Sequence, residues 1–129
     1  MTMIKLTFCL RRLPSLTLEE FQDYWLNKHG PLVASHREAL RIQRYVQLHS
    51  GDPAAAEALR ATRAGSIESA SDIYDGVAQL WWNNAEDLAA TATEPAAIEA
   101  GRQLLEDERK FIDLPNSPLW FGEEKVIFG

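Results

Sequence analysis

The sequence predicts an α+β fold whose elements follow one another in the order β-α-β-β-α-β. Four stretches carry the apolar pattern of strands, at residues 4–11, 42–49, 73–82 and 119–128. Helix-start signals and helical periodicity follow the first and the third of these stretches. This order is that of a ferredoxin-like domain, an antiparallel sheet with helices on one face. With 46% hydrophobic and 25% charged residues, we expect one globular domain over residues 1–129.

The first two strands are predicted from the alternation of apolar side chains with others. One face carries Ile4, Leu6, Phe8 and Leu10 in the first strand, and Ile42, Val46 and Leu48 in the second. Tyr45 and His49 share the opposite face of the second strand, four residues apart. Cys9 is the single cysteine, so no internal disulfide can form, and we expect a small buried residue there.

The first helix is predicted to begin at Thr17, which the following residues place at the N-cap of a capping box. Apolar residues then recur at spacings of three and four, so one face of the helix should pack on the sheet. The helix runs to about His29. Gly30-Pro31 is expected to end or kink it, and Pro31 to begin a short second piece through His36.

The second half of the chain adds an insertion and two helical segments. Residues 51–72 are rich in alanine and contain no aromatic side chain. We expect an insertion here, helical around residues 54–62 and otherwise a mobile loop. Asn84 is the expected N-cap of the next helix, and Pro95 restarts helical structure. The buried side of that segment is expected to carry Ile98, Leu105 and Ile112.

The predicted third strand carries large apolar side chains on both faces, with Trp81 on one side and Leu80 and Trp82 on the other. The fourth predicted strand is similar. Because helices cover only one face of such a sheet, the second apolar face needs another cover. We therefore expect a two-fold homodimer in which the sheets of two copies pack face to face.

The overall charge and motif content exclude several classes of function. A net charge of −6 disfavours binding to nucleic acid or to an anionic membrane surface. One cysteine, together with the lack of a recognisable leader peptide or long apolar run, favours the cytoplasm. The three histidines lack metal-ligand spacing and no nucleotide-binding motif occurs, so we expect no metal and no cofactor.

Several short patterns occur in an order that resembles one known family. They are Leu10-Arg11-Arg12, Tyr24-Trp25, His29-Gly30-Pro31-Leu32, Arg44-Tyr45-Val46-Gln47, Tyr74-Asp75-Gly76-Val77-Ala78, Leu80-Trp81-Trp82, Glu106-Asp107-Glu108 and Phe111-Ile112-Asp113. Together they resemble the EthD family of the dimeric α/β-barrel superfamily. The resemblance implies a barrel formed by two ferredoxin-like subunits. Similar proteins accompany the degradation of ether fuel additives or act as small decarboxylases, and cofactor-free monooxygenases and lactone isomerases share the superfamily.

His29 is the strongest candidate for chemistry, because it continues the apolar stripe of the first helix. Two interpretations stay open: a general acid or base in a pocket between helix and sheet, or a buried histidine bonded to a backbone carbonyl. Its position coincides with the His-Gly-Pro pattern of the family.

Asp75, an aspartate inside a predicted strand, needs a partner, which is either His29 or an arginine or backbone group. Tyr45 is the other group expected to orient His29.

Four further residues are expected to shape or bind a substrate. Trp25 and Trp82 would form apolar walls, although both also suit the core. Tyr24 lies beside the stripe, where its hydroxyl would reach the mouth of a pocket. Arg12 ends the first strand, where it would bind either a substrate anion or a neighbouring acid.

Two functions follow as hypotheses. The first is an enzyme of degradative or secondary metabolism that binds a small apolar or aromatic carbonyl compound. It would act by cofactor-free proton transfer, as in decarboxylation or isomerisation, or as an oxidoreductase by cofactor-free oxygenation. The second is a ligand-binding or accessory protein that uses the same pocket without turnover, with residues 51–72 as a lid or partner contact.

Overall fold

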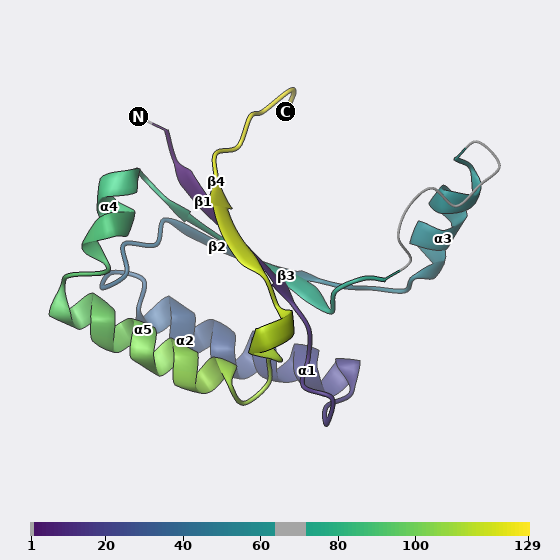
Figure 1. The fold of residues 1–129 in the computed structure, drawn as a ribbon, viewed down its shortest axis with the longest axis horizontal. Coiled ribbons are helices and arrows are strands. Elements are labelled where there is room, and N and C mark those ends of the chain that lie inside the picture. Colours follow the sequence, from purple (N-terminus) through teal and green to yellow (C-terminus); the bar gives the residue numbers. More distant parts are fainter. Residues whose placement is uncertain (1, 64–71) are drawn as a thin grey trace.

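The computed structural model describes residues 2–63 and 72–129, and it confirms the predicted ferredoxin-like α+β fold (Figure 1). A four-stranded sheet has the order β2-β3-β1-β4, and every neighbouring pair is antiparallel. The strands are β1 (Ile4–Leu10), β2 (Arg44–His49), β3 (Gly76–Trp82) and β4 (Leu119–Gly122). The two central strands, β3 and β1, therefore come from distant parts of the sequence.

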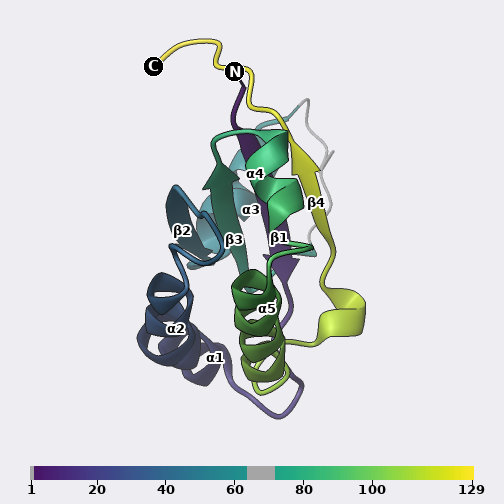
Figure 2. The same cartoon turned by 90° about the vertical axis from the view of Figure 1, so that its left-hand side faces the viewer.

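Helices cover one face of this sheet, as Figures 1 and 2 show from two sides. They are α1 (Leu18–Tyr24), η1 (Trp25–His29), α2 (Gly30–Ser35), α4 (Ala85–Ala90) and α5 (Pro95–Glu108), and a short turn η2 (Leu114–Asn116) leads into β4. Among the described residues, no helix has the length and apolarity needed to cross a bilayer. The sheet and these helices enclose the core between them.

The predicted insertion forms an arm between β2 and β3. Helix α3 (Ala54–Ala61) stands away from the sheet in Figure 1, which confirms a helix within the insertion. The loop that we expected after it includes residues 64–71, which lie outside the described residues. The described residues of the arm do not line the cavity described below.

The apolar stripe of the first helix packs on the sheet as predicted. Phe21 and Trp25 are almost fully buried, and the ring centroids of Phe21 lie 5.6 Å from those of Trp25 and of Phe111. Burial of each such ring contributes about 2 kcal/mol to stability. At the start of α1, the predicted capping box is present, with the Thr17 hydroxyl and the Glu20 carboxylate each accepting the other's backbone N–H.

Helical structure continues through Gly30-Pro31, so of the two expected outcomes, an end or a kink, the end is wrong. Gly30 keeps right-handed helical angles (φ −54°, ψ −51°), and its N–H bonds to the carbonyl of Trp25 in the π-helical turn η1. A proline inside an ordinary α-helix clashes with the carbonyl four residues earlier. The wider π turn gives Pro31 room, and π turns are frequent at functional sites. The second piece, α2, ends next to His36 as predicted.

Four strand ends differ from the prediction, because a strand ends where its neighbour ends. β1 ends at Leu10 instead of Arg11. β2 begins at Arg44 instead of Ile42, β3 at Gly76 instead of Ile73, and β4 ends at Gly122 instead of Phe128. Gly76 pairs with Leu10, the last residue of β1, and Gly122 pairs with Lys5, close to its first residue. Asp75 therefore lies just before a strand and not inside one.

The buried side of α5 also differs from the prediction. Its buried residues are Ala97, Ala100 and Asp107. Ile98 and Leu105 are 53% and 39% exposed. Ile112 is buried as expected, but it lies beyond the end of α5. Its distance in sequence from Ile98 and Leu105 therefore does not indicate which side of the helix is buried. The buried side of α5 therefore carries an aspartate, Asp107.

Candidate functional site

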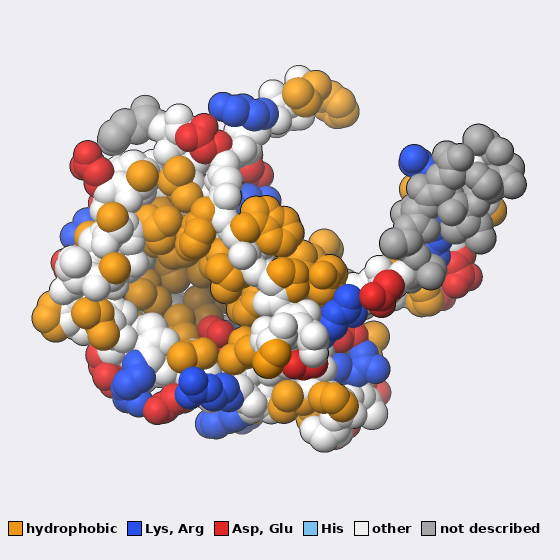
Figure 3. Space-filling view, viewed as in Figure 1, with side chains coloured by type: hydrophobic (Ala, Val, Ile, Leu, Met, Phe, Trp, Pro, Cys, Tyr) orange, Lys and Arg blue, Asp and Glu red, His pale blue; other side chains and the backbone are white. Residues whose placement is uncertain are grey.

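A cavity of about 150 Å³ lies between the helices and the inner face of the sheet. Figure 3 shows a hollow on this side of the molecule, lined mainly by hydrophobic side chains. The apolar lining includes Leu6, Phe8, Val33, Leu80, Trp82 and Leu104. The ionisable side chains in the lining are His29, Tyr45 and Glu108. A dry cavity of this volume accommodates about one aromatic ring.

His29 forms its polar contact with an aspartate that is distant in sequence. Its Nδ1 lies 2.8 Å from Oδ2 of Asp107, and both side chains are largely shielded from solvent. His29 comes from η1 and Asp107 from the last turn of α5, so the packing of these two segments brings them together. The alternative interpretation, a histidine bonded to a backbone carbonyl, does not apply. The carboxylate fixes the orientation of the imidazole ring.

The Asp107 carboxylate is held by further contacts. The Tyr24 hydroxyl donates to its Oδ1 at 2.6 Å, and the Lys110 ammonium lies 3.7 Å from the same oxygen. Burial by itself raises the pKa of Asp107, but the hydrogen bonds from Tyr24 and His29 outweigh it and keep the pKa below its ordinary value. Burial and the bond to Asp107 raise the pKa of Tyr24 to about 12. Asp107 is thus ionised and Tyr24 protonated at neutral pH.

His29 is neutral at pH 7 in this environment. Burial lowers the pKa of its imidazole below the ordinary 6.5, and the Asp107 carboxylate only partly offsets that effect. In the neutral ring, Nδ1–H donates to Asp107, so Nε2 carries the free lone pair. Because Nδ1 is occupied and His29 lines the cavity, Nε2 is the nitrogen left for a bound molecule. This arrangement can accept a proton.

Glu108 follows Asp107 directly and lines the same cavity. Burial raises the pKa of Glu108 to about 7, with a further contribution from the negative charge of Asp107. The two neighbouring carboxyl groups therefore differ in protonation near neutral pH. Such a divergence between adjacent acids is typical of sites that handle protons.

Tyr45 lines the cavity from β2, but no contact between Tyr45 and His29 occurs in the described hydrogen bonds. Its hydroxyl accepts a bond of 2.7 Å from Nε2 of Gln47, which also donates to the Trp25 carbonyl at 3.0 Å. The expectation that Tyr45 orients His29 is therefore wrong. Both residues line the cavity, but Tyr45 belongs to the sheet and His29 to the helical layer.

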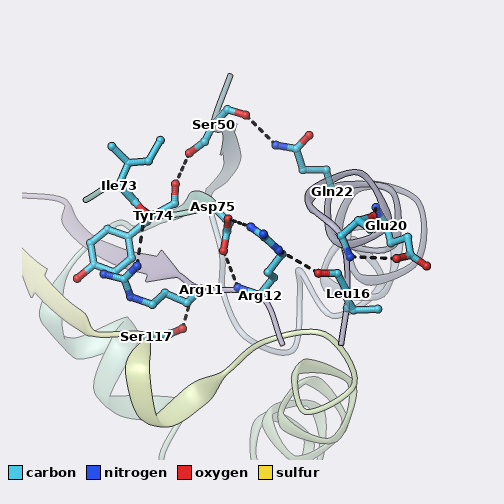
Figure 4. Close-up of polar contacts among 11 residues, drawn as sticks. Arg11, Arg12, Leu16, Glu20, Gln22, Ser50, Ile73, Tyr74, Asp75 and Ser117 are labelled. Carbon is cyan, nitrogen blue, oxygen red and sulfur yellow. Dashed lines mark hydrogen bonds and ion pairs between the residues drawn. The ribbon is translucent and has the colours of Figure 1, made fainter. Parts of the chain in front are cut away.

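Asp75 does not bond to His29 either; its partner is Arg12 (Figure 4). Of the two predicted alternatives, the pairing with His29 is wrong and the pairing with an arginine is confirmed. One oxygen of Asp75 lies 2.5 Å from the Arg12 guanidinium, and the other accepts the backbone N–H of Arg12 at 2.8 Å. The guanidinium also donates to the carbonyl of Leu16. These contacts close the chain around the end of β1 and stabilise the fold. They lie outside the lining of the cavity.

The remaining predicted residues divide between the cavity and its surroundings. Trp25 and Trp82 line it as walls, and both also belong to the buried core. Tyr24 reaches the site only through Asp107. Arg12, expected to bind a substrate anion, is engaged by Asp75 instead. Neither Asp107 nor Glu108 is among the site residues expected from the sequence. A run of three acids at 106–108 on an amphipathic helix was a usable signal, because neighbouring residues there face different directions.

Within residues 2–63 and 72–129, no three His, Cys, Asp or Glu side chains gather as a metal site would require.

Residues 13–115 match the family described as the EthD domain. No functionally curated protein matches the sequence significantly.

Three solved structures illustrate the likeness of the fold. An EthD family protein from Bacillus halodurans has a TM-score of 0.59 at 18% identity, over 95% of this chain and 99% of that chain. A hydroxynitrile lyase from Passiflora edulis has a TM-score of 0.61 at 8% identity, over 99% and 98%. A dimeric ferredoxin-like protein of unknown function from Bacteroides fragilis has a TM-score of 0.57 at 12% identity, over 95% and 96%. At these identities the likeness establishes the fold alone.

Proposed function

The chain belongs to the EthD family, and from this premise we propose that it is an enzyme in which His29 moves a proton of a small carbonyl compound. The observation that carries the proposal is the pairing of a buried neutral histidine with an ionised aspartate at the edge of an apolar cavity. Asp107 holds the imidazole in the tautomer that leaves Nε2 free, and it stabilises the imidazolium formed when Nε2 accepts a proton.

The size and lining of the cavity support a small, mostly apolar ligand. About 150 Å³ suits a single ring with a short substituent, and the walls are aliphatic and aromatic. Nε2 of His29 would remove a proton from the carbon next to a carbonyl group, and the electron pair of that bond would move to the carbonyl oxygen. This step begins isomerisations and oxygenations of enolisable compounds. The similarity in fold to a hydroxynitrile lyase supports the view that this architecture can hold an active site.

The proposal predicts that the protein exchanges the methyl protons of acetophenone for deuterium in D₂O. The rate should exceed the buffer blank and saturate with acetophenone, because exchange occurs on the bound molecule. It should rise with pH through a pKa below 6.5, since only neutral His29 is a base and burial lowers its pKa. Proton NMR of the methyl signal measures the rate. Saturable binding of acetophenone without exchange would instead favour the accessory, ligand-binding function.

We also propose that the protein is a homodimer that packs sheet against sheet. The outer face of the sheet carries Leu48 and Trp120, which are 56% and 52% exposed. Such side chains are expected to be covered by a second copy. The similarity to a dimeric ferredoxin-like protein supports the proposal. Light scattering at micromolar concentration should return twice the 14.5 kDa of one chain, and a monomer mass would contradict it.

A further inference from the structure

We propose that Glu108 and Tyr45 form a subsite for the oxygen of the bound molecule, so that the ligand lies between two hydrogen-bond donors and the base His29. The inference rests on the proposed function and deepens it, since it specifies which chemical class the cavity takes. Three observations carry it. Both side chains line the cavity, Tyr45 accepts a hydrogen bond while Glu108 makes none, and the described part of the lining contains no lysine or arginine.

The Glu108 carboxyl group has no part in the hydrogen bonds of the fold. Asp107, its neighbour, is bonded to Tyr24 and His29, whereas no hydrogen bond or ion pair to the Glu108 side chain occurs within residues 2–63 and 72–129. Successive residues on a helix point about 100° apart. Asp107 can therefore contact His29 while Glu108 lines the cavity. The Glu108 side chain is half-buried, and its carboxyl group has no partner among these residues. A ligand in the cavity can supply that partner.

Glu108 can donate a hydrogen bond because its environment favours the neutral acid. Burial, the first cause, raises its pKa to about 7, and the charge of Asp107 adds to the effect. The other titratable groups in the lining are His29 on η1 and Tyr45 on β2. Both of them are uncharged at neutral pH, since burial lowers the pKa of His29 and raises the pKa of Tyr45. Nothing in the lining therefore draws the proton away from Glu108.

Tyr45 supplies the second donor. Its hydroxyl oxygen already accepts a hydrogen bond from Gln47 at 2.7 Å, and Gln47 is itself anchored on the Trp25 carbonyl. The oxygen is thereby satisfied as an acceptor, which leaves the hydroxyl proton of Tyr45 free to donate. Burial raises the pKa of Tyr45, so this proton stays in place across the neutral range.

This subsite selects a neutral oxygen acceptor, such as a ketone or an enone, over a carboxylate. A ligand carboxylate would meet Glu108 and Tyr45 without a lysine or arginine in the cavity lining to balance its charge. When His29 removes a proton from the adjacent carbon, the negative charge appears on the oxygen held by Glu108 and Tyr45. Donors placed where charge develops stabilise the transition state more than the bound substrate.

A pair of ligands that differ only in the oxygen atom tests the inference. Acetophenone carries a carbonyl oxygen where α-methylstyrene carries a methylene group of nearly the same shape. At pH 6.5, we expect the protein to bind acetophenone about fivefold more tightly than α-methylstyrene, relative to their partition into an apolar solvent. This preference should decline as the pH rises past about 7, because ionised Glu108 cannot donate. Competition with an environment-sensitive fluorescent dye measures both affinities.

Two variants of Glu108 separate its role from a general effect on the cavity. Glu108→Leu should bind α-methylstyrene at least as well as the original protein, and it should lose the part of the preference for acetophenone that depends on pH. Glu108→Gln keeps an N–H donor, so it should retain part of the preference and show no change between pH 6.5 and 8.5. Unaltered binding of α-methylstyrene shows that each variant is folded with its cavity intact. A preference as large in Glu108→Leu as in the original protein, or one that is independent of pH in the original protein, would overturn the inference.

The binding test is independent of the exchange test for His29. If acetophenone binds with the expected preference but its protons do not exchange, the oxygen subsite stands and the proposed catalysis fails. If exchange occurs and the preference is insensitive to Glu108, the catalysis stands and the subsite fails. Tyr45→Phe provides a second check, since it should remove part of the preference at every pH.

Discussion

Replacing His29 with alanine is expected to lower the rate of deuterium exchange into acetophenone at least about a hundredfold, because general base catalysis contributes that much or more. Nε2 of His29 is the free nitrogen of the only buried histidine in the described residues, and no other neutral base lines the cavity. Binding of α-methylstyrene should persist, because that ligand needs no base. An exchange rate within twofold of the original would remove His29 from the mechanism.

The same substitution, aspartate to asparagine, at two positions identifies which aspartate supports His29. Asp107→Asn should lower the exchange rate about tenfold, since it removes the charge that stabilises the imidazolium. Because the Asp107 carboxylate raises the pKa of His29, its loss should move the ascending limb of the pH profile to lower pH. Asp75→Asn should leave both the rate and the profile unchanged, because Asp75 bonds to Arg12. A rate lost equally in both variants would indicate that the effect is on folding.

Replacing Gly76 with alanine is expected to destabilise the protein by about 2–3 kcal/mol, as overpacking of a rigid core does. A Cβ at this position would lie 2.8 Å from Cη2 of Trp25 and 2.9 Å from the backbone carbonyl of Leu48. Gly76 belongs to β3, which is paired with strands on both sides, so the backbone cannot move away. Trp25 is almost fully buried and is itself a cavity wall. The glycine allows the indole to approach the sheet.

Urea denaturation followed by tryptophan fluorescence measures this loss of stability. Gly101→Ala is the matched control, because Gly101 lies inside α5, is exposed, and has no atom within 4 Å of a Cβ. Alanine favours a helix over glycine by up to about 1 kcal/mol, so this variant should be slightly more stable. A loss below about 0.5 kcal/mol for Gly76→Ala would show that the indole can shift without cost.

The order of strands and helices was predictable because each element repeats its own apolar period. Strand residues alternate and helix residues recur every three or four, so each element can be recognised with no knowledge of contacts. The same reasoning placed His29, Trp25 and Trp82 next to the cavity. It failed on α5, where alanines face the sheet while Ile98 and Leu105 are exposed. Small residues such as alanine allow α5 to pack closely, and a pattern of large apolar residues does not predict their burial.

The sequence by itself determined that a histidine would lie on the inner face of a ferredoxin-like domain, because helical periodicity is a local property. Only the tertiary structure decided what that histidine contacts. Asp107 is 78 residues away from His29, and no spacing rule connects them. Asp75, the aspartate that the sequence favoured, is held by Arg12 once β1 ends beside it. The protonation of His29 and Glu108 likewise depends on burial, which exists only after the sheet and α5 have packed together.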